Sequence, residues 1–360
     1  MKITFILSQY KRISGGNRAL FEYVNRLKKM GHSVRLFVVA KPLRWYRIDH
    51  WPRIFNKKVT VLAPETIDWI NNKVPIELLS VNHESLIPDS DILLATAWQT
   101  ADFSASLPES KGKKFYFVQH HESLWTREKG KAQKTYYMPF SKIVISTWLK
   151  DILKEQYQQE AGVFVTPVNR NSFYKEDKNE DAASRVCMLH HDYDWKGYKD
   201  AIEAVKKVRS ENCKIELVVF GEKLEDPASL YEEAGFEFEY HFRPTGETLR
   251  KIYSSCGTFL CSSWYEGLGM PAMEAMMCGT ALVTTDTGGS RDYATNEETA
   301  LVSPIKNPEA LAKNLIRVLT NESLRLQLAE KGYQKIQQFS WDSNCEQLIE
   351  CFEKSLDDQR

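Results

Sequence analysis

A chain of 360 residues exceeds what one ordinary hydrophobic core needs, so we expect two domains of typical size. Its composition is that of a globular protein, and no apolar run approaches the roughly 20 residues that a bilayer-spanning helix needs. The seven cysteines form no CxxC pair and show no metal-ligand spacing, which disfavours a zinc module or a disulfide scaffold and is typical of free thiols in a reducing cytoplasm. Residues 1–8 form one short strand-like run, too short for a secretory signal, so we expect a cytoplasmic protein.

Charge divides the chain into two halves although the net charge is zero. Residues 1–165 contain 25 lysines and arginines against 15 acidic residues, and residues 166–360 contain 23 against 33. A basic half suggests a polyanionic partner such as an anionic membrane surface. The two halves could instead attract each other across a cleft. Nucleic acid is disfavoured because the chain has no basic motif with interleaved aromatic residues.

The first 167 residues alternate strand-like and helix-like segments. Short apolar runs predict strands at residues 3–7, 33–40, 92–95, 115–118 and 143–145. Apolar residues at helical spacing predict helices at residues 17–30 and 147–157. Residues 41–55 are rich in Trp, Arg and Pro, and we expect a surface excursion there. Such an excursion could insert at a membrane interface, shape an acceptor pocket or be an ordinary loop.

The second half repeats this alternation after a polar stretch at residues 167–183, where we place the domain junction. We expect strands at residues 186–189, 215–220, 257–263 and 281–284, and helices at residues 198–209, 248–255, 308–319, 322–338 and 341–356. The alternation in both halves predicts parallel sheets covered by helices, hence two Rossmann-like α/β domains that bind ligands at the carboxyl ends of their strands. The predicted boundaries are 1–167, 168–340 and a closing helix at 341–360.

The segment from Glu266 to Glu274 (EGLGMPAME) is the most informative part of the sequence. A predicted strand precedes it and a predicted helix follows it, so two carboxylates flank a glycine loop at a helix start. Such a loop directs backbone N–H groups and the positive helix end at one spot, which suits a phosphate. Carboxylates accept hydrogen bonds from sugar hydroxyls instead. Both features together suggest a site for a sugar nucleotide. The alternative is an ordinary helix start with an incidental glutamate on either side.

This segment resembles the E-x7-E signature of retaining glycosyltransferases with the GT-B fold, in particular glycosyltransferase family 4. The match includes both glycines, the proline and the following Ala-Met pair, which are Gly267, Gly269, Pro271, Ala275 and Met276. The resemblance covers essentially the whole chain, with its specific motifs within residues 185–305. It implies two Rossmann-like domains whose parallel sheets face each other across a cleft. The first would bind the acceptor, the second the nucleotide sugar, and the closing helix would cross back to the first domain.

The resemblance assigns roles to residues of the second domain. Glu266 would contact hydroxyls of the donor sugar, and Glu274 would bind the ribose of the nucleotide. The loop between them would bind the donor diphosphate at Gly267, Leu268, Gly269 and Met270. Lys196, which precedes Gly197 and a predicted helix, would stabilise the charge that grows on the departing nucleoside diphosphate. A lysine before a helix is otherwise usually just solvated.

The family places an arginine several residues before this lysine, and here the chain departs from the pattern. His190-His191 occupies that position. A protonated His190 would replace the arginine only in part, because an ordinary histidine has a pKa of about 6.5. Arg243 is another candidate for the missing cation, on position alone.

Two motifs of the first domain also match the family. Gly15-Gly16 follows the first strand and opens the first helix, where the family loop faces the donor phosphates and the acceptor. A simple tight turn would have the same sequence. His120 directly follows the predicted strand at 115–119, at whose end many members place a histidine against the donor sugar. His121 is the second candidate, and both could be ordinary surface or core histidines.

The implied reaction moves a sugar from a nucleotide diphosphate donor to a hydroxyl of a glycan or lipid-linked glycan, in cell-surface polysaccharide biosynthesis. Glu266, His120 and Lys196 are the expected catalytic residues. Retention in the family is usually explained by front-face attack, in which the departing phosphate takes the proton of the acceptor. We expect no metal and no cofactor, because a lysine and a helix end replace the metal, and we read Asp192-Tyr193-Asp194 as loop. Peripheral contact with the inner face of a membrane is compatible with the basic first half.

Four other functions compete with this one, and two of them are disfavoured. A sugar-nucleotide epimerase could use the same fold, whereas a glycan phosphorylase would normally need a pyridoxal-binding lysine and a longer chain. A non-catalytic sugar-nucleotide-binding subunit would explain the missing arginine. A nicotinamide dehydrogenase is disfavoured because neither half has G-x-G-x-x-G after its first strand.

Overall fold

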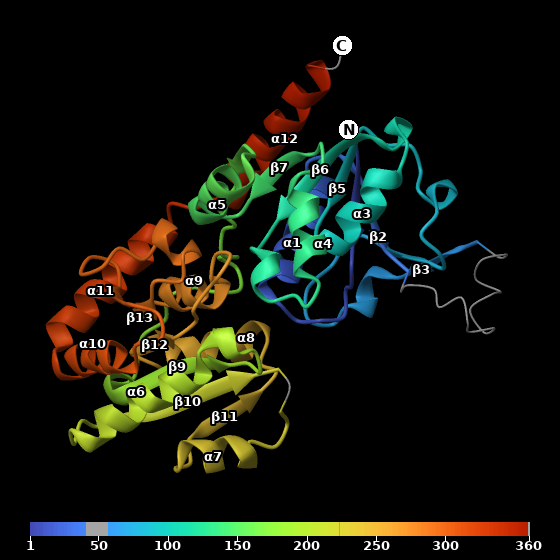
Figure 1. Ribbon diagram of the computed structural model, residues 1–360. Coiled ribbons are helices and arrows are strands. Elements are labelled where there is room, and N and C mark those ends of the chain that lie inside the picture. Colours follow the sequence, from blue (N-terminus) through green and yellow to red (C-terminus); the bar gives the residue numbers. More distant parts are fainter. Residues whose placement is uncertain (41–56, 223, 359–360) are drawn as a thin grey trace. The chain divides into compact units, whose positions relative to one another are not determined.

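The computed structural model describes residues 1–40, 57–222 and 224–358. The excursion predicted at residues 41–55 lies outside these ranges. The chain forms two compact units, which Figure 1 shows coloured along the sequence. The first unit comprises Met1–Ile145, Leu149–Phe164 and Asp342–Arg360, and the second comprises Ser146–Trp148 and Val165–Trp341.

The division into units follows the chain with two exceptions. The main change of unit falls between Phe164 and Val165, close to the junction predicted at residue 167. Ser146–Trp148 belongs to the second unit, which the sequence did not predict. The last helix begins at Trp341 in the second unit, and its remaining residues belong to the first. The first unit is therefore assembled from both ends of the chain.

The first unit is built on an eight-stranded sheet with the order β3-β4-β2-β1-β5-β6-β7-β8. Its strands are β1 (Lys2–Leu7), β2 (Ser33–Val38), β3 (Val59–Leu62), β4 (Ile76–Leu79), β5 (Ile92–Ala95), β6 (Lys113–Val118), β7 (Ser141–Val144) and β8 (Ala161–Val163). All neighbouring strands run parallel except the β3–β4 pair, which is antiparallel. The sequence did not predict β3 and β4, because β3 is largely exposed and β4 contains Glu77.

The described α-helices of this unit are α1 (Gly15–Lys29), α3 (Trp98–Ser106), α4 (Lys129–Tyr136), α5 (Thr147–Tyr157) and α12 (Trp341–Asp357). Helix α1 begins where the Ser14 side chain accepts a hydrogen bond from the backbone of Asn17 at 3.2 Å. Helix α12 is held to the rest of the unit by a hydrogen bond from Tyr23 to Asn344 at 2.6 Å and by an edge-on contact between Phe352 and Phe115.

The second unit is built on six parallel strands with the order β11-β10-β9-β12-β13-β14. The strands are β9 (Arg185–His190), β10 (Glu216–Gly221), β11 (Glu239–Phe242), β12 (Thr258–Cys261), β13 (Ala281–Thr285) and β14 (Leu301–Ser303). The helices are α6 (Tyr198–Ser210), α7 (Ala228–Ala234), α8 (Gly246–Ser254), α9 (Met270–Met277), α10 (Pro308–Thr320) and α11 (Glu322–Ile336). Strands buried on both faces are typical of a parallel sheet.

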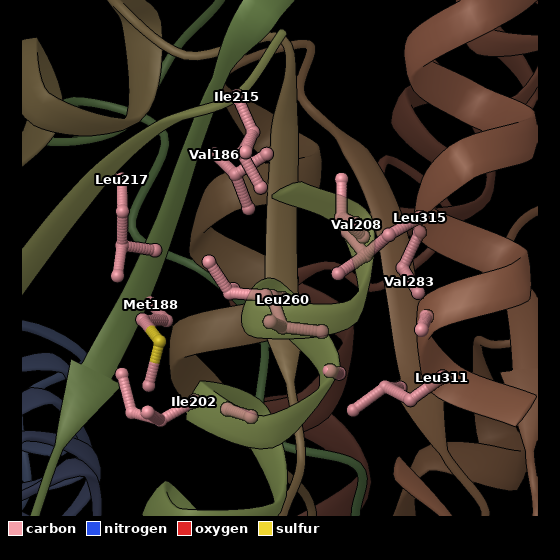
Figure 2. Close-up of a cluster of buried hydrophobic side chains, with 14 of the residues drawn as sticks. Val186, Met188, Ile202, Val208, Ile215, Leu217, Leu260, Val283, Leu311 and Leu315 are labelled. Atoms are coloured by element: carbon pink, nitrogen blue, oxygen red, sulfur yellow. The ribbon is translucent and has the colours of Figure 1, made fainter. Parts of the chain in front are cut away.

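Apolar residues of this sheet and its helices form one core. Figure 2 shows Met188 of β9 and Leu260 of β12 near Ile202 of α6, and Val283 of β13 near Leu315 of α10. All five are at most 3% exposed. This packing fixes the strands, and the loops at their carboxyl ends start from a rigid base.

The polar stretch at the predicted junction is tied to the second unit by a partly buried lysine. Lys178 donates hydrogen bonds to the carbonyl groups of Tyr253, Ser254 and Cys256, at the carboxyl end of α8. These oxygens are among those that a helix end leaves unpaired. Burial lowers the pKa of Lys178. Among the described residues, no helix has both the length and the apolar content that crossing a bilayer requires.

Candidate active site

The segment between β12 and α9 is fixed by backbone hydrogen bonds to the loop that follows β13. The N–H of Glu266 donates to the carbonyl of Thr287 at 3.0 Å, and the N–H of Gly289 donates back to the carbonyl of Glu266 at 3.2 Å. The Thr285 hydroxyl donates to the carbonyl of Ser263. The position of Glu266 at the carboxyl edge of the sheet is therefore determined by the sheet itself.

Glu266 and Lys196 form an ion pair within this edge. Lys196 Nζ lies 2.6 Å from Glu266 Oε1, and the Ser263 hydroxyl donates to the same oxygen at 2.7 Å. The side chains of Lys196 and Glu266 are 15% and 11% exposed, so the pair is shielded from most solvent but remains reachable. Both protein donors contact Oε1, and within the described part of the chain Oε2 has no hydrogen-bond donor. Oε2 is thus available to accept a hydrogen bond from a ligand hydroxyl.

Lys196 is positioned by a short turn between β9 and α6. It ends the 3-10 helix Asp194–Lys196, and its ammonium lies 4.5 Å from the centre of the Trp195 ring. Gly197 follows with a φ of +66°, and a Cβ there would lie 2.0 Å from the carbonyl oxygen of Ser262. Only glycine permits this approach of the lysine turn to β12, because any side chain would collide with the backbone.

Helix α9 begins with backbone donors that the protein leaves unpaired. The N–H groups of Leu268, Gly269 and Met270 donate no hydrogen bond within the residues that the structure describes. Gly269 caps the helix with a φ of +92°, in contact with the hydroxyl of Tyr293. Free N–H groups at a helix start have the geometry that binds phosphate and other anions.

Glu274 lies in the same helix but in a different environment. It is only 3% exposed, and its carboxylate accepts a hydrogen bond from the Tyr253 hydroxyl at 3.2 Å. The sequence assigned Glu274 to a ribose. In this structure the side chain is almost completely buried, so little of it is exposed to a ribose.

His190 ends β9, one strand away from β12 and at the same edge. Its imidazole is 6% exposed and meets the Tyr198 ring edge-on, with 4.7 Å between ring centres. The His191 ring packs against the Tyr193 ring at a tilt of 32°, with 4.3 Å between ring centres. Arg243, the other candidate cation, follows β11 on the exposed surface, and its N–H donates to the carbonyl of Gly221 at 2.7 Å. The structure therefore places Arg243 in solvent and His190 in a packed environment.

The candidate residues of the first unit meet at the carboxyl ends of β1 and β6. Gly15 and Gly16 form the first turn of α1, and a Cβ on Gly16 would lie 3.0 Å from the side-chain oxygen of Gln119. His120 comes directly after Gln119 and is partly exposed. His121 instead points into the protein, where Nε2 lies 3.0 Å from the hydroxyl of Tyr157 and burial lowers its pKa to about 4. Of the two histidines His120 is therefore the more exposed, although both of its ring nitrogens are buried.

Sequence reasoning missed residues that support the candidate side chains. Ser263 was predicted only as part of a strand. Its hydroxyl, three positions before Glu266, could have indicated a hydrogen bond to that carboxylate. Trp195 and Glu122 were likewise given no role. Their partners come from other elements of the fold, so no local pattern marks them.

Part of this chain matches the model of a known protein family. Residues 151–335, just over half of the chain, match the model of the glycosyl transferases group 1. The chain belongs to this family. The fold agrees with that assignment: over 98% of this chain and all of the other, it matches Anabaena Alr3699/HepE, solved in complex with UDP, with a TM-score of 0.75 and 14% identity. The expected GT-B type of α/β fold, with two parallel-sheet domains, is confirmed.

Sequence relatives match only part of the chain. A D-inositol 3-phosphate glycosyltransferase of Salinispora tropica is 29% identical over 39% of this chain and 30% of its own length. An N,N'-diacetylbacillosaminyl-diphospho-undecaprenol alpha-1,3-N-acetylgalactosaminyltransferase of Campylobacter jejuni is 23% identical over 54% of this chain and 50% of its own length. The chain spans about half the length, or less, of the curated relatives it matches.

Proposed function

We propose that this protein is a retaining glycosyltransferase that moves a sugar from a nucleotide diphosphate donor to a hydroxyl of a glycan or lipid-linked glycan. The observation that carries the proposal is the Lys196–Glu266 pair beside the unpaired N–H groups that open α9. It places a cation, anion-binding backbone donors and a carboxylate oxygen with a free lone pair at one edge of one sheet. A sugar diphosphate needs these three kinds of partner.

Each residue has a role in this reaction. Lys196 and the α9 N–H groups bind the diphosphate and stabilise the negative charge that grows on it as the sugar leaves. Glu266 Oε2 accepts a hydrogen bond from a hydroxyl of the donor sugar and orients the ring. Glu274 holds the ribose, and His120 and the Gly15-Gly16 turn contribute from the first unit. Catalysis is then mainly positioning and charge stabilisation, because none of these groups is an obvious nucleophile.

Retention of the anomeric configuration is proposed through attack from the face that the diphosphate leaves. The leaving phosphate oxygen accepts the acceptor proton, so the bond to the acceptor forms as the bond to the phosphate breaks. The proposal includes no metal, because Lys196 and the helix start supply the positive charge. The anomeric coupling constant of the product, measured by NMR, tests retention directly.

The donor and acceptor classes are inferred from relatives. HepE was solved with UDP, and the Campylobacter relative is named for an acceptor on diphospho-undecaprenol. We infer a nucleoside diphosphate sugar as donor and a glycan, free or lipid-linked, as acceptor, with a role in cell-surface polysaccharide biosynthesis. A basic first half would suit peripheral contact with an anionic membrane face.

Calorimetric titration with UDP, GDP, dTDP and ADP, each with and without magnesium, tests the nucleotide site. We expect tight binding of one nucleotide that does not depend on the metal. Incubation with sugar forms of that nucleotide and a panel of glycan acceptors then tests transfer.

A second candidate is a non-catalytic sugar-nucleotide-binding protein. The observation that favours it is His190, which stands where the family has an arginine and is buried against Tyr198. Nucleotide binding with no transfer to any acceptor would support this candidate over an enzyme.

A further inference from the structure

A buried carboxylate lies directly behind the turn that presents His120. Glu122 opens the 3-10 helix Glu122–Leu124 after β6 and is 8% exposed. It belongs to none of the motifs that the sequence matched. A buried carboxylate is costly unless hydrogen bonds stabilise it, so its partners indicate why the fold retains it.

The carboxylate joins two elements of the first unit. Its Oε2 accepts a hydrogen bond from the Tyr116 hydroxyl on β6 at 2.7 Å and from the backbone N–H of Trp98 at 2.9 Å. Trp98 is the first residue of α3, so Glu122 satisfies one of the N–H groups that a helix start leaves unpaired. The side chain thus fixes the turn after β6 to the start of α3.

Tyr136 of α4 holds the same turn from the other side. Its hydroxyl accepts a hydrogen bond from the backbone N–H of Glu122 at 2.9 Å and lies 3.5 Å from the carbonyl oxygen of His120. The His120 ring meets the Trp125 ring edge-on. Three elements therefore converge on the backbone that orients His120, and Glu122 bonds to two of them through its side chain.

We propose that Glu122 is a positioning residue that sets the orientation of His120 for sugar transfer. It acts through the backbone of the turn and through the start of α3, without touching the substrate. This inference rests on the proposed function, because it takes His120 to be a residue that contacts the donor sugar.

The ionisation of this cluster supports the proposal. Burial raises the pKa of Glu122 to about 7, so the group changes charge near neutral pH. The groups that face it do not: burial raises the pKa of Tyr116 and Tyr136 far above neutrality and lowers that of His121 to about 4. Among Glu122, Tyr116, Tyr136 and His121, only Glu122 therefore has a pKa near neutrality.

Two variants separate the charge of Glu122 from its hydrogen bonds. Glu122→Gln keeps an oxygen that can accept from Tyr116 and Trp98, and Glu122→Ala removes both bonds. Glu128→Gln, six positions on and half-exposed, makes the same charge change on the surface and is the matched control. The measurements are kcat and KM for transfer across pH 6–9, together with the dissociation constant of the nucleotide.

Glu122→Ala is expected to lower kcat by about tenfold or more, since the loss of two buried hydrogen bonds is felt at the turn. The dissociation constant of the nucleotide should change less than about twofold, because its proposed partners belong to the second unit. Glu122→Gln should keep kcat within about threefold of the wild type but lose the change in kcat near pH 7. If both variants keep the wild-type kcat and pH profile, or if nucleotide affinity falls in parallel with kcat, the proposal is overturned.

A second measurement does not depend on turnover, so it separates this inference from the proposed function. The NMR signal of the His120 ring, assigned with His120→Gln, is followed from pH 5 to 9 in the wild type and in Glu122→Gln. A second inflection near pH 7 in the wild type alone supports the positioning role, even if no transfer is found. Identical curves in both proteins contradict it, and this holds also if Glu122→Ala fails to fold.

Discussion

Lys196 Nζ and Glu266 Oε1 lie 2.6 Å apart although 70 positions separate the two residues in the sequence. The contact joins the turn before α6 to the loop before α9, and both follow central strands of the same sheet. A ligand that binds the lysine is therefore next to the carboxylate. The pair also has a cost, because both charges lose contact with bulk water, and their mutual attraction has to offset this desolvation.

The first prediction concerns the carboxylate. Glu266→Gln keeps the shape of the side chain and removes its charge, so the hydroxyl that it orients loses a charge-assisted hydrogen bond. Transfer should fall by about 100-fold or more, while the dissociation constant of the nucleotide changes less than about threefold. Steady-state kinetics and calorimetry measure the two effects. Glu298→Gln, an exposed glutamate of the same unit, is the control, and transfer at the wild-type rate in Glu266→Gln would remove Glu266 from the mechanism.

The second prediction concerns the lysine. Lys196→Ala removes the cation proposed for the diphosphate and leaves the Glu266 carboxylate without its ionic partner. Nucleotide affinity should fall about tenfold or more, and the free energy of unfolding should fall by about 1–3 kcal/mol. Calorimetry and urea denaturation measure these changes. Lys196→Arg keeps the charge, so it should recover part of the affinity. Equal affinity in the wild type and Lys196→Ala would show that the diphosphate binds elsewhere.

The third prediction concerns Ser263, whose hydroxyl donates to the same oxygen of Glu266. Ser263→Ala leaves the carboxylate held by Lys196 alone, so its Oε2 is less well oriented. We expect kcat to fall by about tenfold with little change in nucleotide affinity. Ser262→Ala is a close control, because the Ser262 hydroxyl makes only a 3.3 Å bond to the carbonyl of Lys196. An equal effect of both variants would argue against a specific role for Ser263.

The fourth prediction concerns Gly197. An alanine Cβ there would lie 2.0 Å from the carbonyl oxygen of Ser262, and the backbone has a φ of +66°. Gly197→Ala should lower the free energy of unfolding by more than about 2 kcal/mol. Gly130→Ala is the control, since it lies in α4 with no heavy atom within 4 Å of the new Cβ, and it should be neutral or slightly stabilising. Thermal denaturation of the two variants distinguishes a local backbone constraint from a general intolerance of alanine.

The fifth prediction is a pH dependence of stability. The pKa of Glu122 is about 7 in the folded protein and 4.5 for an ordinary glutamate, so the folded state favours the protonated form. The contribution of this group is fully present below pH 4.5 and is lost as the pH rises to about 7, a change of about 3 kcal/mol.

The Glu122→Gln variant should not show this loss of stability between pH 4.5 and 7, because its side chain does not ionise. His121 acts in the opposite direction, because its lowered pKa makes the protein less stable as the pH falls below 6.5. The difference between wild type and Glu122→Gln, measured by urea denaturation at pH 5 and pH 8, isolates the glutamate. A difference that is the same at both pH values would show that Glu122 does not titrate in this range.

The sequence predicted the α/β architecture because the strands that form the two sheets are apolar and alternate with amphipathic helices. It did not predict β3 and β4 of the first unit, because both strands are short, β3 is partly exposed, and β4 contains a charged residue. Glu77 of β4 is tolerated because it pairs with Arg35 on the neighbouring strand β2. Such a pairing depends on strand order, which a local pattern does not contain.

The candidate site also has features that the sequence predicted and features that it did not. The glycine loop and the helix start could be predicted because backbone geometry is encoded locally, in Gly269 and in the residues that follow it. The contacts of Ser263 and Glu122 could not, because their partners lie on other elements. The burial of His190 was also hidden, since Tyr198 and Gly221, which enclose it, come from α6 and β10.

Helix α12 imposes an order on how the protein is made. All residues of the second unit precede position 342 in the chain, so its whole sequence is synthesised before the part of α12 that belongs to the first unit. Most of the first unit is synthesised earlier but cannot close, because Phe352 and Asn344, which contact Phe115 and Tyr23, follow the second unit in the chain. During synthesis the apolar surface beneath α12 therefore remains uncovered longest, and a premature stop codon near position 341 would leave it exposed to chaperones and proteases.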